Sequence, residues 1–152
     1  MGTSKVRELM DMNNFDPKIV ESLRSFFTAM RVWELACTDR HRQIDKGRGK
    51  LSGPEALAID ALELKDVFHK HCTTWDNPFR TGTFVQGSEY DPDGEKILSV
   101  EQEGDAATVY TEQTTSRPKN KYVYKLKRTS DGWRLLDEKY RVTNEGLTPW
   151  FL

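Results

Sequence analysis

Two histidines and a cysteine lie close together in the segment HKHC, residues 69–72, and zinc sites use these side chains. The segment ends a helix-like pattern, in which His69 and His71 would be two positions apart and would point in different directions. The only other histidine and the only other cysteine are His41 and Cys37. We therefore predict no metal site. The histidines are interpreted as a helix end, where cationic side chains suit the negative end of the helix dipole.

Other combinations of reactive side chains do not define a catalytic site either. The loop DKGRGK, 45–50, has two glycines, but no strand precedes it and no GK[ST] follows, so it does not match a phosphate-binding loop. Adjacency of His71 and Cys72 in sequence does not establish a nucleophile and its base. A curved sheet could enclose an acid–base pocket, and its candidate residues are Asp76, Tyr110 and His69. Their spacing in the sequence does not distinguish them from structural residues. We predict no catalytic residue and no cofactor.

Charge is distributed unevenly along the second half of the chain. Residues 89–112 include eight acidic side chains and one basic side chain, whereas residues 117–128 include six basic side chains and no acidic one. If these segments form adjacent hairpins, cross-strand pairing would neutralise both. Otherwise an acidic rim would attract a basic protein partner. Both interpretations stay open. The candidate binding residues are Glu89, Tyr90, Asp91, Asp93, Glu95, Glu101, Glu103 and Asp105, with Tyr90 as an aromatic anchor.

Length and composition predict one domain, 1–152, that begins with a loose lead-in segment, 1–15. The net charge of −1 does not favour a nucleic-acid-binding protein, which is usually strongly basic. No apolar run approaches the length of a membrane span, and the charged first residues are unlike a secretory signal. The two cysteines form no CxxC pair and are expected to be free thiols. We expect a cytoplasmic protein.

Helices are predicted in the first half of the chain and strands in the second half. A helix should be capped by Asp16, begin at Pro17 and bury the stripe Ile19, Leu23, Phe26, Met30, Trp33 and Cys37. A second helix should be capped by Ser52 or Gly53, open at Pro54 and bury the stripe Leu57, Ala61, Leu64, Phe68 and Cys72. This order predicts an α+β fold, with helices packed on one face of a mainly antiparallel sheet.

Period-two patterns predict the strands. The expected strand segments are TFVQGSEY, EKILSVEQE, ATVYTEQTT, KYVYKLKR and GWRLLDEKYRV. Turns are expected at 91–94, 103–105 and 116–120. The ending LTPWFL, 147–152, carries three large apolar side chains, which should pack back on the domain or contribute to a homodimer or partner contact.

The segments FFTAMRVWE (26–34) and FVQGSEYDP (84–92) and the hairpin YVYKLKRTSDGWRLLDEKYRV (122–142) together resemble the nuclear transport factor two-like superfamily. In that fold a strongly curved sheet wraps around helices as a cone. The resemblance covers roughly residues 17–145 and is nearest to the bacterial immunity-protein branch. It implies a protein encoded beside a polymorphic toxin that neutralises the toxin by direct binding, with no shared catalytic motif.

We therefore predict an immunity protein that is not an enzyme and that occludes a cognate toxin domain stoichiometrically. Reversing Asp91, Asp93 and Glu95 to lysine should slow association and leave the fold intact. The alternative is a small-molecule-binding protein, or an enzyme of the isomerase or dehydratase type, that uses the cone cavity. The superfamily includes such enzymes, and fold alone does not decide between the two. A roomy cavity with converging polar groups would favour the alternative, and a filled interior would favour the binding protein.

Overall fold

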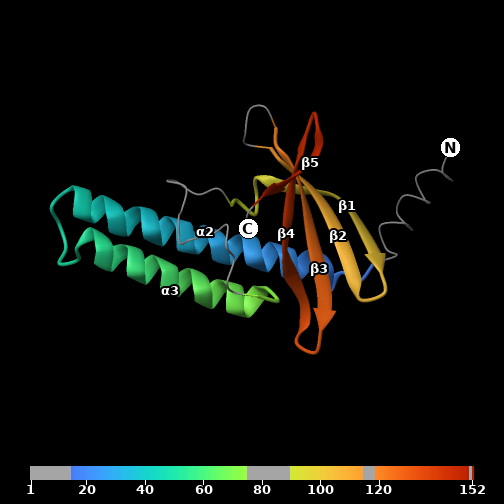
Figure 1. Ribbon diagram of the computed structural model, residues 1–152, viewed down its shortest axis with the longest axis horizontal. Helices are drawn as coiled ribbons and strands as arrows, with labels where there is room; N and C mark the ends of the chain where they lie inside the picture. Colours follow the sequence, from blue (N-terminus) through green and yellow to red (C-terminus); the bar gives the residue numbers. More distant parts are fainter. Residues whose placement is uncertain (1–14, 75–89, 115–118, 151) are drawn as a thin grey trace.

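The computed structural model of the chain describes residues 15–74, 90–114, 119–150 and 152 (Figure 1). Two helices, α2 (Lys18–Asp45) and α3 (Gly53–His71), precede all five strands. The strands are β1 (Glu95–Glu103), β2 (Ala106–Gln113), β3 (Lys121–Thr129), β4 (Gly132–Thr143) and β5 (Gly146–Trp150). They form one antiparallel sheet in the order β1-β2-β3-β4-β5. The predicted α+β arrangement is confirmed. The segment 1–14 and most of the predicted strand TFVQGSEY lie outside the described residues.

Helix α2 begins at Lys18, within one residue of its predicted start at Pro17. The carboxyl group of Asp16 accepts a hydrogen bond from the Lys18 amide at 3.0 Å and another from the indole nitrogen of Trp133 at 3.0 Å. Asp16 therefore both caps the first turn and ties the helix to β4. The predicted stripe is confirmed, because all its members are buried: Ile19, Leu23, Phe26, Met30, Trp33 and Cys37.

Helix α3 begins at a capping box in which Ser52 and Glu55 each accept a hydrogen bond from the other residue's amide. Its predicted stripe was partly wrong, since Leu57 is 55% exposed and Ala61 is also exposed. The side chains that the helix buries are Ala56, Asp60, Leu64 and Phe68. These residues follow one another at steps of four, and the polar side chain at Asp60 hid the pattern from a search for apolar residues.

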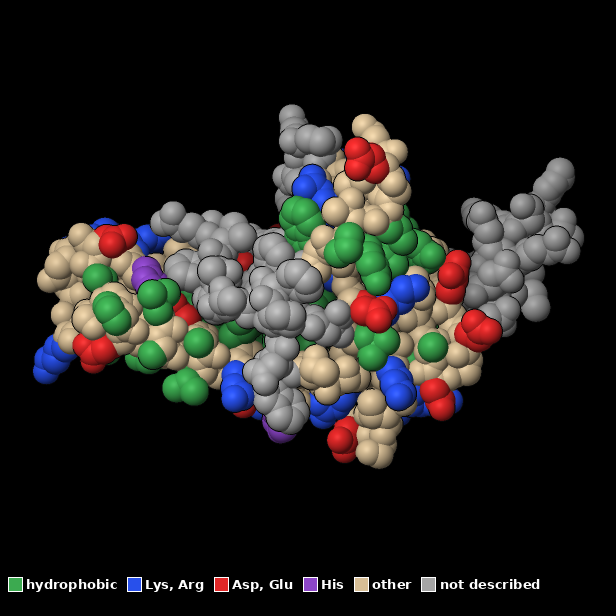
Figure 2. Space-filling model, in the orientation of Figure 1, with side chains coloured by type: hydrophobic (Ala, Val, Ile, Leu, Met, Phe, Trp, Pro, Cys, Tyr) green, Lys and Arg blue, Asp and Glu red, His purple; other side chains and the backbone are tan. Residues whose placement is uncertain are grey.

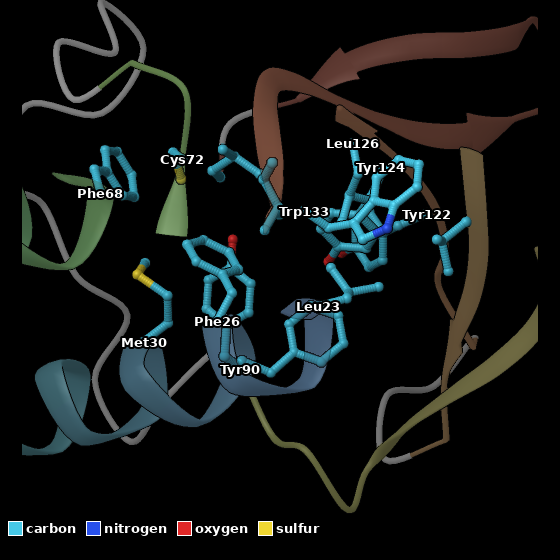
Figure 3. Close-up of a cluster of buried hydrophobic side chains, with 14 of the residues drawn as sticks. Leu23, Phe26, Met30, Phe68, Cys72, Tyr90, Tyr122, Tyr124, Leu126 and Trp133 are labelled. Carbon is cyan, nitrogen blue, oxygen red and sulfur yellow. The ribbon is translucent and has the colours of Figure 1, made fainter. Parts of the chain in front are cut away.

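The first part of α2 lies across the inner face of the sheet, and the helical hairpin extends beyond the sheet (Figure 1). Figure 3 shows the side chains that fill the space between helices and strands, among them Phe26, Tyr124 and Trp133. Phe26 and Phe27 contact Tyr90 with ring centroids 5.6 and 5.9 Å apart, and Phe27 contacts Tyr124 at 5.3 Å. This aromatic packing forms the core.

Strand β5 was not predicted, although its segment was expected to pack on the domain. It pairs with β4 from Thr143↔Gly146 to Lys139↔Trp150. Trp150 is half-buried with the Arg141 guanidinium 5.1 Å from its ring centroid, and Leu152 is buried. The expected packing of the chain end is therefore confirmed for these two residues. Neither described helix is long and apolar enough to cross a membrane.

Candidate functional site

The predicted acidic residues that the structure describes follow β1 from end to end. Asp91 and Asp93 lie in the turn before the strand, in which the Gly94 amide donates to the Asp91 carbonyl at 3.1 Å. Glu101 and Glu103 lie on the strand itself, and Asp105 lies in the turn to β2. Figure 2 shows acidic side chains on the surface near the β1 side of the sheet. Glu89 lies outside the described residues.

Tyr90 was predicted as an aromatic anchor for a partner, and this was wrong. Its side chain is 0% exposed and packs against Phe26 and Phe27. Its amide donates to Oε1 of Glu34, a fully buried side chain of α2, at 3.0 Å. Because the ring lies inside the domain, it cannot be inserted into a partner without unfolding this region.

Glu95 was also predicted as an exposed binding residue, but its side chain is buried. It is 2% exposed and pairs in the sheet with Gln113. Its Oε2 accepts hydrogen bonds from Thr111 Oγ1 at 2.6 Å and from the Tyr124 hydroxyl at 2.9 Å. The carboxyl group therefore serves as an internal acceptor, and reversing it to lysine would disturb the fold.

A buried lysine also lies in this interior, and it was not predicted from the sequence. Lys139 is 2% exposed, and its Nζ lies 4.7, 4.3 and 5.1 Å from the ring centroids of Tyr90, Tyr122 and Tyr124. The ammonium also donates to the Tyr90 hydroxyl at 3.3 Å. A cation surrounded by aromatic faces is stabilised by their quadrupoles. Here the ammonium group of Lys139 contacts the Tyr90 hydroxyl and the three rings.

The candidate acid–base residues are not brought together. Tyr110 is directed away from the helices, since its neighbours Val109 and Thr111 on β2 point into the core. Burial, together with the nearby Glu101, raises the Tyr110 pKa. His69 is exposed near the end of α3, and Asp76 lies outside the described residues. Within the described residues no three metal-ligating side chains form a group.

Cross-strand pairing neutralises part of the acidic rim. Asp105 binds Arg128, with Oδ1 2.6 Å from Nη2 and 2.7 Å from Nε, and Glu112 lies 3.8 Å from Lys121. At the other end of β1, Asp91 lies 3.7 Å from Arg31 of α2. The structure supports the pairing interpretation for Asp105 and Glu112, whereas Asp91 is paired with a helix and not with the basic segment.

Three acidic residues of the rim, Asp93, Glu101 and Glu103, form no ion pair within the described residues. All three side chains are exposed, and Glu101 accepts a 3.5 Å hydrogen bond from the Tyr110 hydroxyl. We name these three residues the open acidic rim. The charge along β1 is thus available to a partner chiefly at Asp93 and at the end of the strand.

A second buried carboxyl group lies between the helices and was missed. Asp60 is fully buried, contacts the Arg40 guanidinium, and lies 2.5 Å from Nε2 of His41. Burial, and then the neighbouring Asp60 side chain, raises the pKa of the Cys37 thiol to about 12. This cluster holds the two helices together beyond the sheet, and its thiol is unsuited to nucleophilic chemistry.

Comparison with protein families supports the resemblance seen in the sequence. The family model described as NTF2 fold immunity protein matches residues 18–148, which include both helices and most of the sheet. The two helices and the antiparallel sheet are consistent with this α+β fold. A search of the curated proteins and a search of the solved structures find no match.

Proposed function

Since the chain belongs to the NTF2 fold immunity protein family, whose general role is to neutralise toxins, we propose that it binds one cognate toxin domain and covers the surface that the toxin needs. Inhibition then follows from stoichiometric occlusion, with no reaction carried out by this chain. An interface of ordinary size would bury about 800 Å² on each partner.

The observation that carries the proposal is the open acidic rim, Asp93, Glu101 and Glu103, on an otherwise nearly neutral chain. Exposed side chains of one sign produce a field that steers an oppositely charged partner and raises its association rate. We therefore place the contact at β1 and propose that the toxin surface is basic. Asp91 and Asp105 belong to the periphery of this surface, since each already has an arginine partner.

The test is a charge reversal with a matched control. The triple variant Asp93→Lys, Glu101→Lys, Glu103→Lys removes the open acidic rim. The control, Asp131→Lys, Glu138→Lys, Glu145→Lys, changes exposed residues of the β3–β4 turn, β4 and the β4–β5 turn and alters the net charge equally. Both variants should keep the circular dichroism spectrum of the unaltered chain, because all six side chains are exposed.

Association with the cognate toxin domain, which we expect to be encoded by a neighbouring gene, is then measured by surface plasmon resonance at two salt concentrations. The rim variant should associate at least about tenfold more slowly at low salt, and the difference should shrink as salt screens the charges. The control should stay within about twofold of the unaltered chain, apart from the shared net-charge effect. Equal rates for the two variants would contradict the proposed location.

A further inference from the structure

Strand β1 forms an edge of the sheet. It pairs with β2 on one side, and no strand of the described chain pairs with its other side (Figure 1). An edge strand presents a row of amide and carbonyl groups that another extended chain can bind. The strand is bulged between Ile97 and Ser99, so the regular part of this edge is the segment 99–103.

A hollow of about 440 Å³ opens beside this edge, between β1 and the beginning of α2. It is lined mainly by apolar side chains, namely Phe15, Val20, Ile97, Leu98 and Val100, together with Ser99 and Arg24. Leu98, the extra residue of the bulge, is 45% exposed. A chain that paired with β1 would have this apolar hollow under one of its faces.

The register of β1 defines which side chains would lie beside the other face of a segment bound to this strand. Val100 and Gln102 pair with the buried residues Val109 and Ala107, so they point toward the helices. Glu101 and Glu103 alternate with them and point to the outer face of the sheet, where both are exposed. An added strand alternates in the same way, and its outward side chains would lie beside these two carboxylates.

We propose that β1 binds an extended segment of the toxin by strand addition, and that this segment alternates apolar with basic side chains. The apolar side chains enter the hollow at Leu98, and the basic ones pair with Glu101 and Glu103. Main-chain hydrogen bonds supply affinity and the alternating pockets supply selectivity, as in other cases of strand addition. This inference rests on the proposed toxin binding and specifies how the binding is made.

Residue-resolved amide hydrogen exchange tests the proposal. It is measured on the labelled full-length chain alone and on the same chain in complex with its cognate toxin domain. On binding, alternate amides of 99–103 should exchange at least about tenfold more slowly, because only every second amide of an edge strand lacks a partner in β2. The edge strand β5 supplies the internal control and should not change. Unchanged exchange in 99–103 in a stable complex overturns strand addition. If no complex forms, the proposed toxin binding itself fails.

Two other occupants of the edge give different results. If 99–103 is already protected in the free chain at every concentration, another segment of the same chain occupies the edge, and the proposal is wrong. If its protection in the free chain rises with protein concentration, a second copy occupies the edge, and the proposal is again wrong.

A substitution in the hollow gives an independent readout. Leu98→Asp should weaken toxin binding at least about tenfold, because it places a charge where an apolar side chain is to be buried. Leu147→Asp on β5, where the leucine is 54% exposed, is the matched control and should change affinity less than about twofold. Equal affinities of the two variants would show that the hollow is not used.

Discussion

Removing the carboxyl group of Glu95 should destabilise the protein strongly, although the residue belongs to a segment whose sequence predicts an acidic surface. Glu95→Ala leaves the hydroxyl groups of Thr111 and Tyr124 without the oxygen to which both donate, at 2.6 and 2.9 Å. Both of these side chains are fully buried. Losing this acceptor costs about 1–3 kcal/mol for each of the two buried donors, so the free energy of unfolding should fall by about 2–6 kcal/mol.

Urea unfolding, followed by circular dichroism at several denaturant concentrations, measures this loss. Since domains of this kind unfold with slopes of about 1–3 kcal/mol per molar urea, the midpoint should fall by roughly 1–3 M. Glu101→Ala on the same strand is the matched control, because Glu101 is exposed, and it should change stability by less than about 0.5 kcal/mol. A loss below about 1 kcal/mol for Glu95→Ala would refute the interior placement of this residue.

Three further predictions concern groups away from β1. Asp60→Asn should lower the free energy of unfolding, measured by urea titration, by about 3 kcal/mol, because it breaks a buried pair with Arg40. The control Asp66→Asn, at an exposed pair with Lys70, should lower it by less than about 1 kcal/mol. Similar losses in the two variants would contradict the role of Asp60 as a buried ion-pair partner. In a Cys72→Ser variant, whose one remaining thiol is Cys37, the pKa raised to about 12 should make the reaction with Ellman's reagent at pH 8 roughly a thousandfold slower than that of an ordinary thiol. Fast reaction of this folded variant would contradict the burial of Cys37. Burial, and then the positive charges of Arg134 and Lys70, lower the pKa of His71 below 6.5, so His71 binds a proton more readily in the unfolded chain than in the folded chain. The free energy of unfolding should therefore fall as the pH drops below about 6.5. Urea titrations at pH 5.5 and 7.5 measure this dependence, and His71→Gln should remove part of it.

The elements that repeat a simple pattern could be predicted from the sequence. The stripe of α2 follows steps of three and four without interruption, and the β3–β4 hairpin alternates on both sides of a glycine-containing turn. Strand β5 was missed because it is short and contains Pro149, which argues against a strand unless it lies at an edge. For α3, apolar residues occur on both faces, so only the tertiary contacts of Asp60 identify the buried side.

The candidate site was predicted only in part, because charge counts along a sequence do not tell which face a side chain occupies. Glu95 and Glu101 are both glutamates of β1, but the bulge at Leu98 lies between them, and one points inward while the other is exposed. Glu34, Lys139 and Asp60 are polar groups whose burial depends on partners distant in sequence. Their roles could not be derived from local patterns.

The most direct test of the central claim is the stoichiometry of inhibition. The activity of a fixed concentration of the toxin domain, well above the dissociation constant, is titrated with this chain. Occlusion predicts a linear loss of activity that ends at one chain per toxin domain, with the two proteins recovered unmodified as a 1:1 complex. Complete inhibition far below one equivalent would reveal turnover, and undiminished activity in excess chain would mean that it does not neutralise this toxin.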